Sequence, residues 1–260
     1  MSYARVLLFP LTSPSIVMCQ DWIPPGDPDP HAILNEARAD YRAGEYANAL
    51  VKHEWFHEEA LSIEPALSGV RLSFALHDWY ELAKQYPPAM QSLAAARDRA
   101  RQQVLSNQDA FRPFSDYNAI CKRLGEWHKT VELFVLLDSE NPGHAARVYG
   151  VAQDALVKDQ QYDLCGKYID AKKDLISIIE VFKLERKYAQ HNGPHKKHRK
   201  EFCERRYTND SAILVALLVK NDRSSEAHEA ADEFKKEWDD EAFHEQIDQA
   251  LEGVVPAPWP

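Results

Sequence analysis

The stretch that decides the fold is residues 41 to 65, YRAGEYANALVKHEWFHEEALSIEP, and it supports two incompatible interpretations. Apolar residues recur three and four positions apart on both sides of Gly44, which predicts two amphipathic helices joined by a tight turn. The centre of the stretch, His53-Glu54-Trp55-Phe56-His57, also matches the H-E-x-x-H pattern of zinc hydrolases. Choosing between a helical repeat and a metal site largely decides whether the protein is an enzyme.

The helical pattern extends on both sides into a hairpin of about 34 residues, a length typical of helical repeats. Pro65 follows the second helix, at a point where a helix cannot continue. Similar units begin at Val70, Phe111 and Ala145. In the second unit Pro87-Pro88 occupies the first turn of a predicted helix, where proline is tolerated.

The motif Y-x-x-G-x-Y-x-x-A-L, followed by A-L-x-x-x-P, resembles the tetratricopeptide repeat. The resemblance covers residues 31–171 and, more weakly, 201–251, and the third unit, from Phe111 to Pro142, is in near-consensus register. It implies an all-α fold, an α-α superhelix built as a solenoid of helical hairpins. It also implies a protein-interaction scaffold that binds a protein or peptide partner in a concave groove.

By the geometry of that family, the first helix of each pair lines the groove. The residues at those positions are Asn35, Arg38, Arg42, Arg71, Phe74, Asp78, Arg112, Lys122, Arg123, Tyr149 and Gln153. Most of the basic ones lie in the first and third units, which favours an acidic peptide or a C-terminal carboxylate as the partner. The Lys/Asn set of repeat proteins that clamp a carboxylate is incomplete, because Arg38 and Ala119 stand where asparagine is expected.

Outside the repeats the sequence predicts three further regions. Residues 1–30 form an N-terminal arm with a proline-rich leader, since QDWIPPGDPDP at 20–30 excludes a helix. Residues 172–252 are expected to form degenerate helical repeats that end in a polar capping helix. Residues 253–260 are expected to form a frayed, proline-rich tail, with docking as an extended segment in an aromatic groove as the alternative.

Three features argue against the alternative of a zinc-dependent hydrolase with His53 and His57 as ligands and Glu54 as the base. Glu58 and Glu59 follow the motif directly, no third histidine stands at the expected position, and no strands are predicted to cover the helix. The helix is nevertheless four residues longer than the repeat requires, and the extra turn carries the histidines. Phosphate-binding and nucleophile-elbow motifs do not occur, so the sequence predicts no catalytic residue and no cofactor.

A second alternative is a nucleic-acid or acidic-partner adaptor that uses the basic segment 191–206. Its candidate contacts are Lys196, Lys197, Arg199, Lys200, Arg205 and Arg206. A solvated loop is expected over residues 191–200, and Phe202 and Tyr207 are the nearby aromatics that could stack on bases. The cluster His191, His195, His198 and Cys203 has irregular spacing, and the adjoining cations would repel a metal ion.

The bulk composition limits the class of partner. A net charge of -10 argues against general affinity for nucleic acid or an anionic membrane. The four cysteines are widely separated, which favours reduced thiols in a cytoplasmic protein. The apolar run after Arg5 has a weak resemblance to a signal peptide, so export is the alternative. The sequence contains no apolar run of the roughly 18 residues that a membrane span needs.

Overall fold

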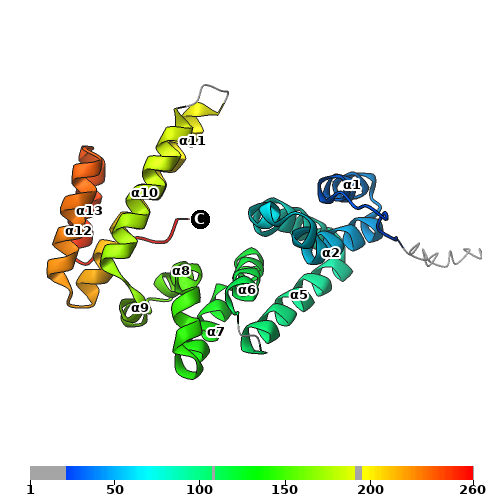
Figure 1. Cartoon of the computed structure of the whole chain (residues 1–260), viewed down its shortest axis with the longest axis horizontal. Coiled ribbons are helices and arrows are strands. Elements are labelled where there is room, and N and C mark those ends of the chain that lie inside the picture. Colours follow the sequence, from blue (N-terminus) through cyan, green and yellow to red (C-terminus); the bar gives the residue numbers. More distant parts are fainter. Residues whose placement is uncertain (1–21, 107–108, 191–194, 260) are drawn as a thin grey trace, which may run out of the picture. The chain divides into compact units, whose positions relative to one another are not determined.

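The computed structural model describes residues 22–106, 109–190 and 195–259. Every regular element within these residues is helical (Figure 1), which confirms the predicted all-α class. The chain separates into two compact units, one up to Leu93 and the other from Ala94 onward. The division falls inside α5 (Pro87–Ser106), whereas the sequence placed a boundary at 171–172, inside the second unit.

The first unit is built on a helical hairpin formed by α1 (Pro30–Ala43) and α2 (Tyr46–Ile63). The Asp29 side chain caps α1 by accepting a hydrogen bond from the backbone N–H of His31 at 2.8 Å. Gly44, between the helices, has a φ of 80°, a left-handed conformation that favours glycine. The turn predicted at this position is therefore confirmed.

The connection from α2 to α4 (Leu76–Gln85) winds through three short turns. They are η1 (Pro65–Leu67), α3 (Ser68–Val70) and η2 (Arg71–Ala75). The last of these is a π-helical turn that runs directly into α4, and such a turn shifts the side chains that follow relative to a regular helix. Both η2 and α4 pack against α2, so Arg71 meets the interior of the unit.

The second unit continues with helices whose bounds follow the sequence pattern closely. They are α6 (Phe111–Leu124), α7 (Trp127–Glu140), α8 (Pro142–Lys158) and the short α9 (Tyr162–Tyr168). Helix α6 packs on both α7 and α8, and α8 packs on α9, as consecutive hairpins do. Phe114 and Phe134 are fully buried between α6 and α7, with ring centroids 6.5 Å apart.

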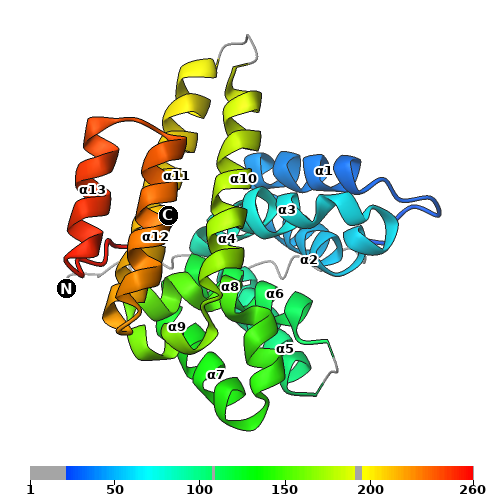
Figure 2. The same cartoon turned by 60° about the vertical axis from the view of Figure 1, so that its left-hand side comes forward.

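Helix α11 is the centre of the remaining part of the second unit. The elements here are α10 (Ala171–Ala189), α11 (Lys196–Lys220), α12 (Ser224–Glu237) and α13 (Glu241–Leu251). Helix α11 packs on α9, α10, α12 and α13, and Figure 2 shows α10, α12 and α13 beside it. All residues from 211 to 218 are buried, as expected of a helix enclosed by its neighbours.

The start of α11 corrects one expectation. The loop predicted over residues 191–200 is wrong for residues 196–200, which are helical, while 191–194 lie outside the described residues. Lysine, arginine and glutamate favour helices, and oppositely charged pairs four residues apart add to that preference. Two such pairs are present, Lys197 with Glu201 at 3.8 Å and Lys200 with Glu204 at 3.5 Å.

Gly166 allows α9 to approach the end of α11 closely. A Cβ atom at this position would lie 1.9 Å from Oδ1 of Asn221. The Nδ2 of Asn221 donates to the carbonyl oxygens of Tyr162 at 3.0 Å and Leu217 at 2.8 Å, so it cannot turn away without losing both bonds. We expect Gly166→Ala to lower the free energy of unfolding by about 2 kcal/mol in urea denaturation. Gly150→Ala in α8, where the space is open, should leave it unchanged or slightly raised.

Candidate functional site

Three of the predicted groove residues of the first unit, Asn35, Arg38 and Asp78, contact one another, and two others, Arg42 and Phe74, are exposed. Nε of Arg38 lies 2.7 Å from Oδ2 of Asp78, and Nη1 of Arg38 donates to Oδ1 of Asn35 at 3.2 Å. Phe74 is 67% exposed and Arg42 is also exposed. These side chains lie at or near the surface, as predicted for a binding face.

The prediction that Arg71 lines a binding groove is wrong, because its side chain is buried and cannot contact a partner. Its Nε donates to the carbonyl oxygen of His57 at 2.6 Å, and its Nη2 lies 3.2 Å from Nε2 of the same histidine. The His57 ring packs against Trp79, with centroids 5.5 Å apart. The π-helical turn explains the difference, since it directs Arg71 to α2 where a regular repeat would direct it to solvent.

The same contacts give the residues of the H-E-x-x-H motif a structural role. A guanidinium beside Nε2 of His57 puts positive charge where a zinc ion would bind. His53 is buried, which lowers its pKa to about 4, and Glu54 accepts a hydrogen bond from Ser92. Among the residues that the structure describes, His, Cys, Asp and Glu side chains form no group of three or more suited to a metal ion. The extra turn of α2 therefore carries interior packing.

Three of the six basic residues predicted as contacts on α11, namely Lys197, Lys200 and Arg206, are paired with carboxylates. In addition to the two pairs within the helix, Nη1 of Arg206 lies 2.6 Å from Oε1 of Glu185 on α10. Tyr207 is 2% exposed and packs in the core, so the expectation that it could stack on bases is wrong. Phe202 is half exposed, and its ring contacts Trp259. His191, from the predicted metal-like cluster, lies outside the described residues.

A hollow of about 800 Å³ opens in the second unit between α8, α10 and α11. Two of the predicted groove residues, Tyr149 and Gln153, line it from α8, although Tyr149 is only 7% exposed and packs on Tyr168. Charged side chains on its walls are Arg147, Asp154, Asp170, Lys173, Asp174, Arg206 and Asp210. The walls of the hollow thus consist of residues that are far apart in sequence and that meet around α11.

Carboxylates outnumber cations on the walls of the hollow. Desolvation raises the pKa of Asp154, Asp174 and Asp210 above the ordinary value, although nearby cations act in the opposite direction. The Asp154 side chain is 59% exposed, so water weakens this effect there more than at Asp210. With four carboxylates and three cations, the walls of the hollow carry nearly balanced charge.

The other predicted groove residues of the second unit lie on α6. Nζ of Lys122 is 3.8 Å from Oδ2 of Asp154, an exposed pair that links α6 to the rim of the hollow. Arg112 is exposed and Arg123 is partly buried. Of the predicted residues in this unit, the structure therefore brings Lys122, Tyr149 and Gln153 to the hollow or its rim.

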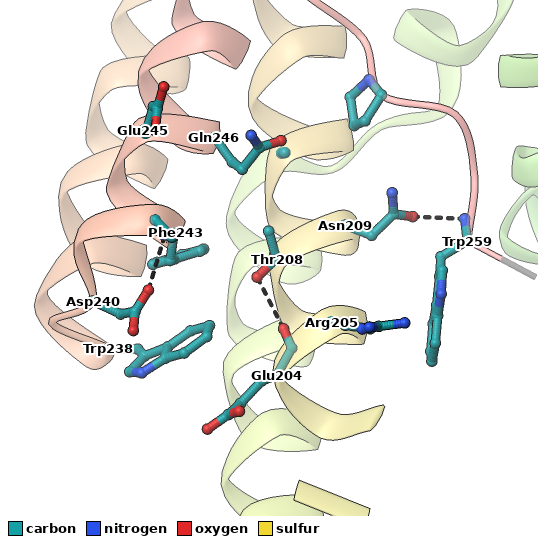
Figure 3. A pocket seen from close by; sticks show the side chains of 13 residues that line it. Glu204, Arg205, Thr208, Asn209, Trp238, Asp240, Phe243, Glu245, Gln246 and Trp259 are labelled. Carbon is teal, nitrogen blue, oxygen red and sulfur yellow. Dashed lines mark hydrogen bonds between the residues drawn. The ribbon is translucent and has the colours of Figure 1, made fainter. Parts of the chain in front are cut away.

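The C-terminal segment, residues 254–259, crosses α11 next to the hollow. Nδ2 of Asn209 donates to the carbonyl oxygen of Ala257, and Oδ1 of Asn209 accepts from the backbone N–H of Trp259, both at 2.9 Å. Figure 3 shows the Asn209 carboxamide pointing to the backbone of Trp259. The Trp259 ring lies 4.7 Å from that of Phe202, measured between centroids. Residues 254–259 are therefore docked on α11, and the expectation of a frayed tail is wrong for them.

A smaller cavity of about 490 Å³ adjoins the C-terminal segment on the side of α13. Its walls include Trp238 and Phe243, with Asn209 and Trp259 opposite (Figure 3). Trp259 also lines the larger hollow, so it separates two open volumes. Sequence reasoning missed Asn209, because its role depends on a contact fifty residues away in the chain.

The cysteines of the second unit are poor nucleophiles. Cys121, Cys165 and Cys203 are free and buried, and burial raises the pKa of each thiol to about 11. A thiol with such a pKa is almost entirely protonated near neutral pH. No covalent chemistry is therefore expected from these three side chains.

Comparison with protein-family models found no match, and neither curated proteins nor solved structures gave a significant similarity. The resemblance to tetratricopeptide repeats accordingly stays a prediction. Across the three described ranges, none of the helices has the length and apolar character required to cross a membrane.

Proposed function

We propose that the protein is a non-catalytic adaptor whose second unit binds a segment of a partner protein in the hollow between α8, α10 and α11. The observation that carries the proposal is the hollow itself, which is large enough for several side chains and includes two residues that the resemblance assigns to a binding groove. Aromatic side chains at its edge, Tyr168, Phe202 and Trp259, supply the kind of surface that protein partners favour.

Among the described residues, the histidines of the H-E-x-x-H motif and the thiols of the second unit favour an adaptor over an enzyme. His53 and His57 belong to the first unit, where they are buried and His57 contacts a guanidinium. The thiols of the second unit are protonated near neutral pH. A catalytic site needs an activated nucleophile or an accessible acid and base in one place, and these residues do not supply one.

We also propose that part of the second unit is a solenoid of hairpins and that the segment it binds is not acidic. The packing of α6 on α7 and α8 supports a solenoid of hairpins in that region, whereas α11 is surrounded by four helices in the manner of a bundle. The near balance of four carboxylates and three cations on the walls of the hollow favours a neutral segment over the acidic one that the sequence suggests. Buried free thiols favour the cytoplasm.

Filling the hollow should abolish partner binding. Ser177 lines it from α10, and an indole at this position would occupy part of its volume. We expect proteins that co-purify with the wild-type chain to be lost with Ser177→Trp and kept with Ser139→Trp, a matched change on the exposed face of α7. Quantitative mass spectrometry of the captured proteins measures this, and circular dichroism verifies that both variants fold. Identical capture by a folded Ser177→Trp variant would show the proposed function to be wrong.

A further inference from the structure

We infer that the face of α11 around Asn209 is a binding site for an extended, neutral segment of a partner protein in which an aromatic residue follows closely spaced prolines. The inference rests on the proposed function and names the chemistry of the partner. In the present structure the protein's own segment 254–259, Val-Val-Pro-Ala-Pro-Trp, occupies this site.

Asn209 binds the main chain of the C-terminal segment. In an extended chain, the carbonyl of one residue and the N–H of the residue two positions further point to the same side. Asn209 donates to the carbonyl oxygen of Ala257 and accepts from the N–H of Trp259, as a residue on an adjacent β-strand would. Because both bonds are made to the main chain, any extended segment with these two groups free can replace the protein's own.

The prolines of the segment are placed where they leave the contacts with Asn209 intact. Pro256 and Pro258 alternate with the residues that Asn209 contacts, so the missing N–H groups are at positions whose backbone faces away from Asn209. Proline also restricts the free segment to extended conformations, which lowers the entropy lost on binding. The pattern Pro-x-Pro-aromatic therefore satisfies the site at low cost, while a proline at the position of Trp259 would remove a required donor.

The site is larger than residues 254–259, which occupy it in this structure. The Trp259 ring contacts Phe202 on one side, but open volumes of about 490 and 800 Å³ adjoin it. A partner segment that continues past the aromatic residue, or that carries bulkier side chains, can fill space that residues 254–259 leave open. The protein's own segment thus acts as an intramolecular competitor, at an effective concentration of about 1 mM for a short tether.

The test uses a fluorescein-labelled peptide, VVPAPWP, and fluorescence anisotropy. It compares the full chain, the chain ending at Gly253, and the shortened chain with Asn209→Ala or with Asn35→Ala, a matched truncation in the first unit. We expect binding to the shortened chain, at least about tenfold weaker binding to the full chain, and at least about tenfold weaker binding after Asn209→Ala. Asn35→Ala should change the affinity less than about twofold, as expected of a residue that belongs to the first unit.

A second variant covers the case in which the shortened chain does not fold. Full-length Trp259→Ala keeps the segment but loses its contact with Phe202, and it should bind the peptide more tightly than the wild type does. The inference is overturned if neither chain binds the peptide, or if Asn209→Ala leaves its affinity unchanged. A dimer that dissociates when residues 254–260 are removed would also overturn it, since the occupant would then be a second copy.

The outcomes separate this inference from the proposed function. Loss of partners with Ser177→Trp, combined with no peptide binding, would leave the adaptor in place and show that the class of segment is wrong. Peptide binding that depends on Asn209, combined with unchanged capture by Ser177→Trp, would support the site on α11 and reject the hollow as the place where partners bind.

Discussion

Replacing Tyr207 by alanine is expected to lower the free energy of unfolding of the second unit by about 4 kcal/mol. The side chain is 2% exposed and stacks on Phe182, with ring centroids 4.0 Å apart. It also contacts Phe234, Trp238 and Phe243, so it joins α10 and α11 to the last two helices. Truncation would leave a cavity at the point where four segments meet, and such a cavity cannot close without moving helices.

Two control variants separate the parts of this effect. Tyr207→Phe removes only the hydrogen bond from the hydroxyl to the carbonyl oxygen of Phe234, 3.2 Å long, and should cost about 1 kcal/mol. Tyr188→Ala removes an aromatic ring that is 62% exposed on α10, and should change stability by less than about 0.5 kcal/mol. Urea denaturation combined with hydrogen exchange in α10 to α13 measures all three. A Tyr207→Ala chain as stable as Tyr188→Ala would contradict the central role of this cluster.

The first unit should lose about 3 kcal/mol of stability between pH 6.5 and pH 4 through His53 alone. Burial lowers the pKa of His53 to about 4, while the charge of Asp78 raises it and that of Arg38 lowers it. In the unfolded chain His53 binds a proton near pH 6.5, whereas in the folded unit it does so only near pH 4. Lowering the pH from 6.5 to 4 therefore favours the unfolded state. Below pH 4 both states are protonated and this contribution has been lost.

The measurement is a series of denaturation curves from pH 7 to pH 4, compared between variants because carboxylates also titrate at the acidic end. His53→Gln should remove about 3 kcal/mol from the total change, since glutamine stays neutral. Parallel profiles for the wild type and His53→Gln would mean that His53 is not held neutral by the fold.

Local patterns in the sequence predict the helices of this protein well. The bounds of α6 and α7 follow from apolar spacing over fourteen residues each, and the turn at Gly44 follows from its position between two such patterns. These elements depend on residues within a few turns of one another, so the necessary information is contiguous. Residues 196–200 show where local patterns are insufficient. Their high density of charge suggests a solvated loop, but pairing with carboxylates one turn later stabilises a helix.

The site depends on contacts that no local pattern contains. Arg71 was assigned to a groove by repeat geometry, but the π-helical turn directs it to His57, fourteen residues earlier. The same contact decides the meaning of H-E-x-x-H, a motif that is ambiguous when its neighbours in space are unknown. Asn209 is one of several polar residues on α11, and only the return of the C-terminal segment distinguishes it.

The three buried cysteines have a practical consequence for studies of the second unit. Cys121, Cys165 and Cys203 lie on α6, α9 and α11, so each helix carries its own chemical reporter. A thiol-reactive dye can label them only when the surrounding structure opens, since reagent and solvent are both excluded in the packed state. If Cys203 reacts faster than the other two, α11 opens by itself; if all three react at one rate, the unit unfolds as a whole.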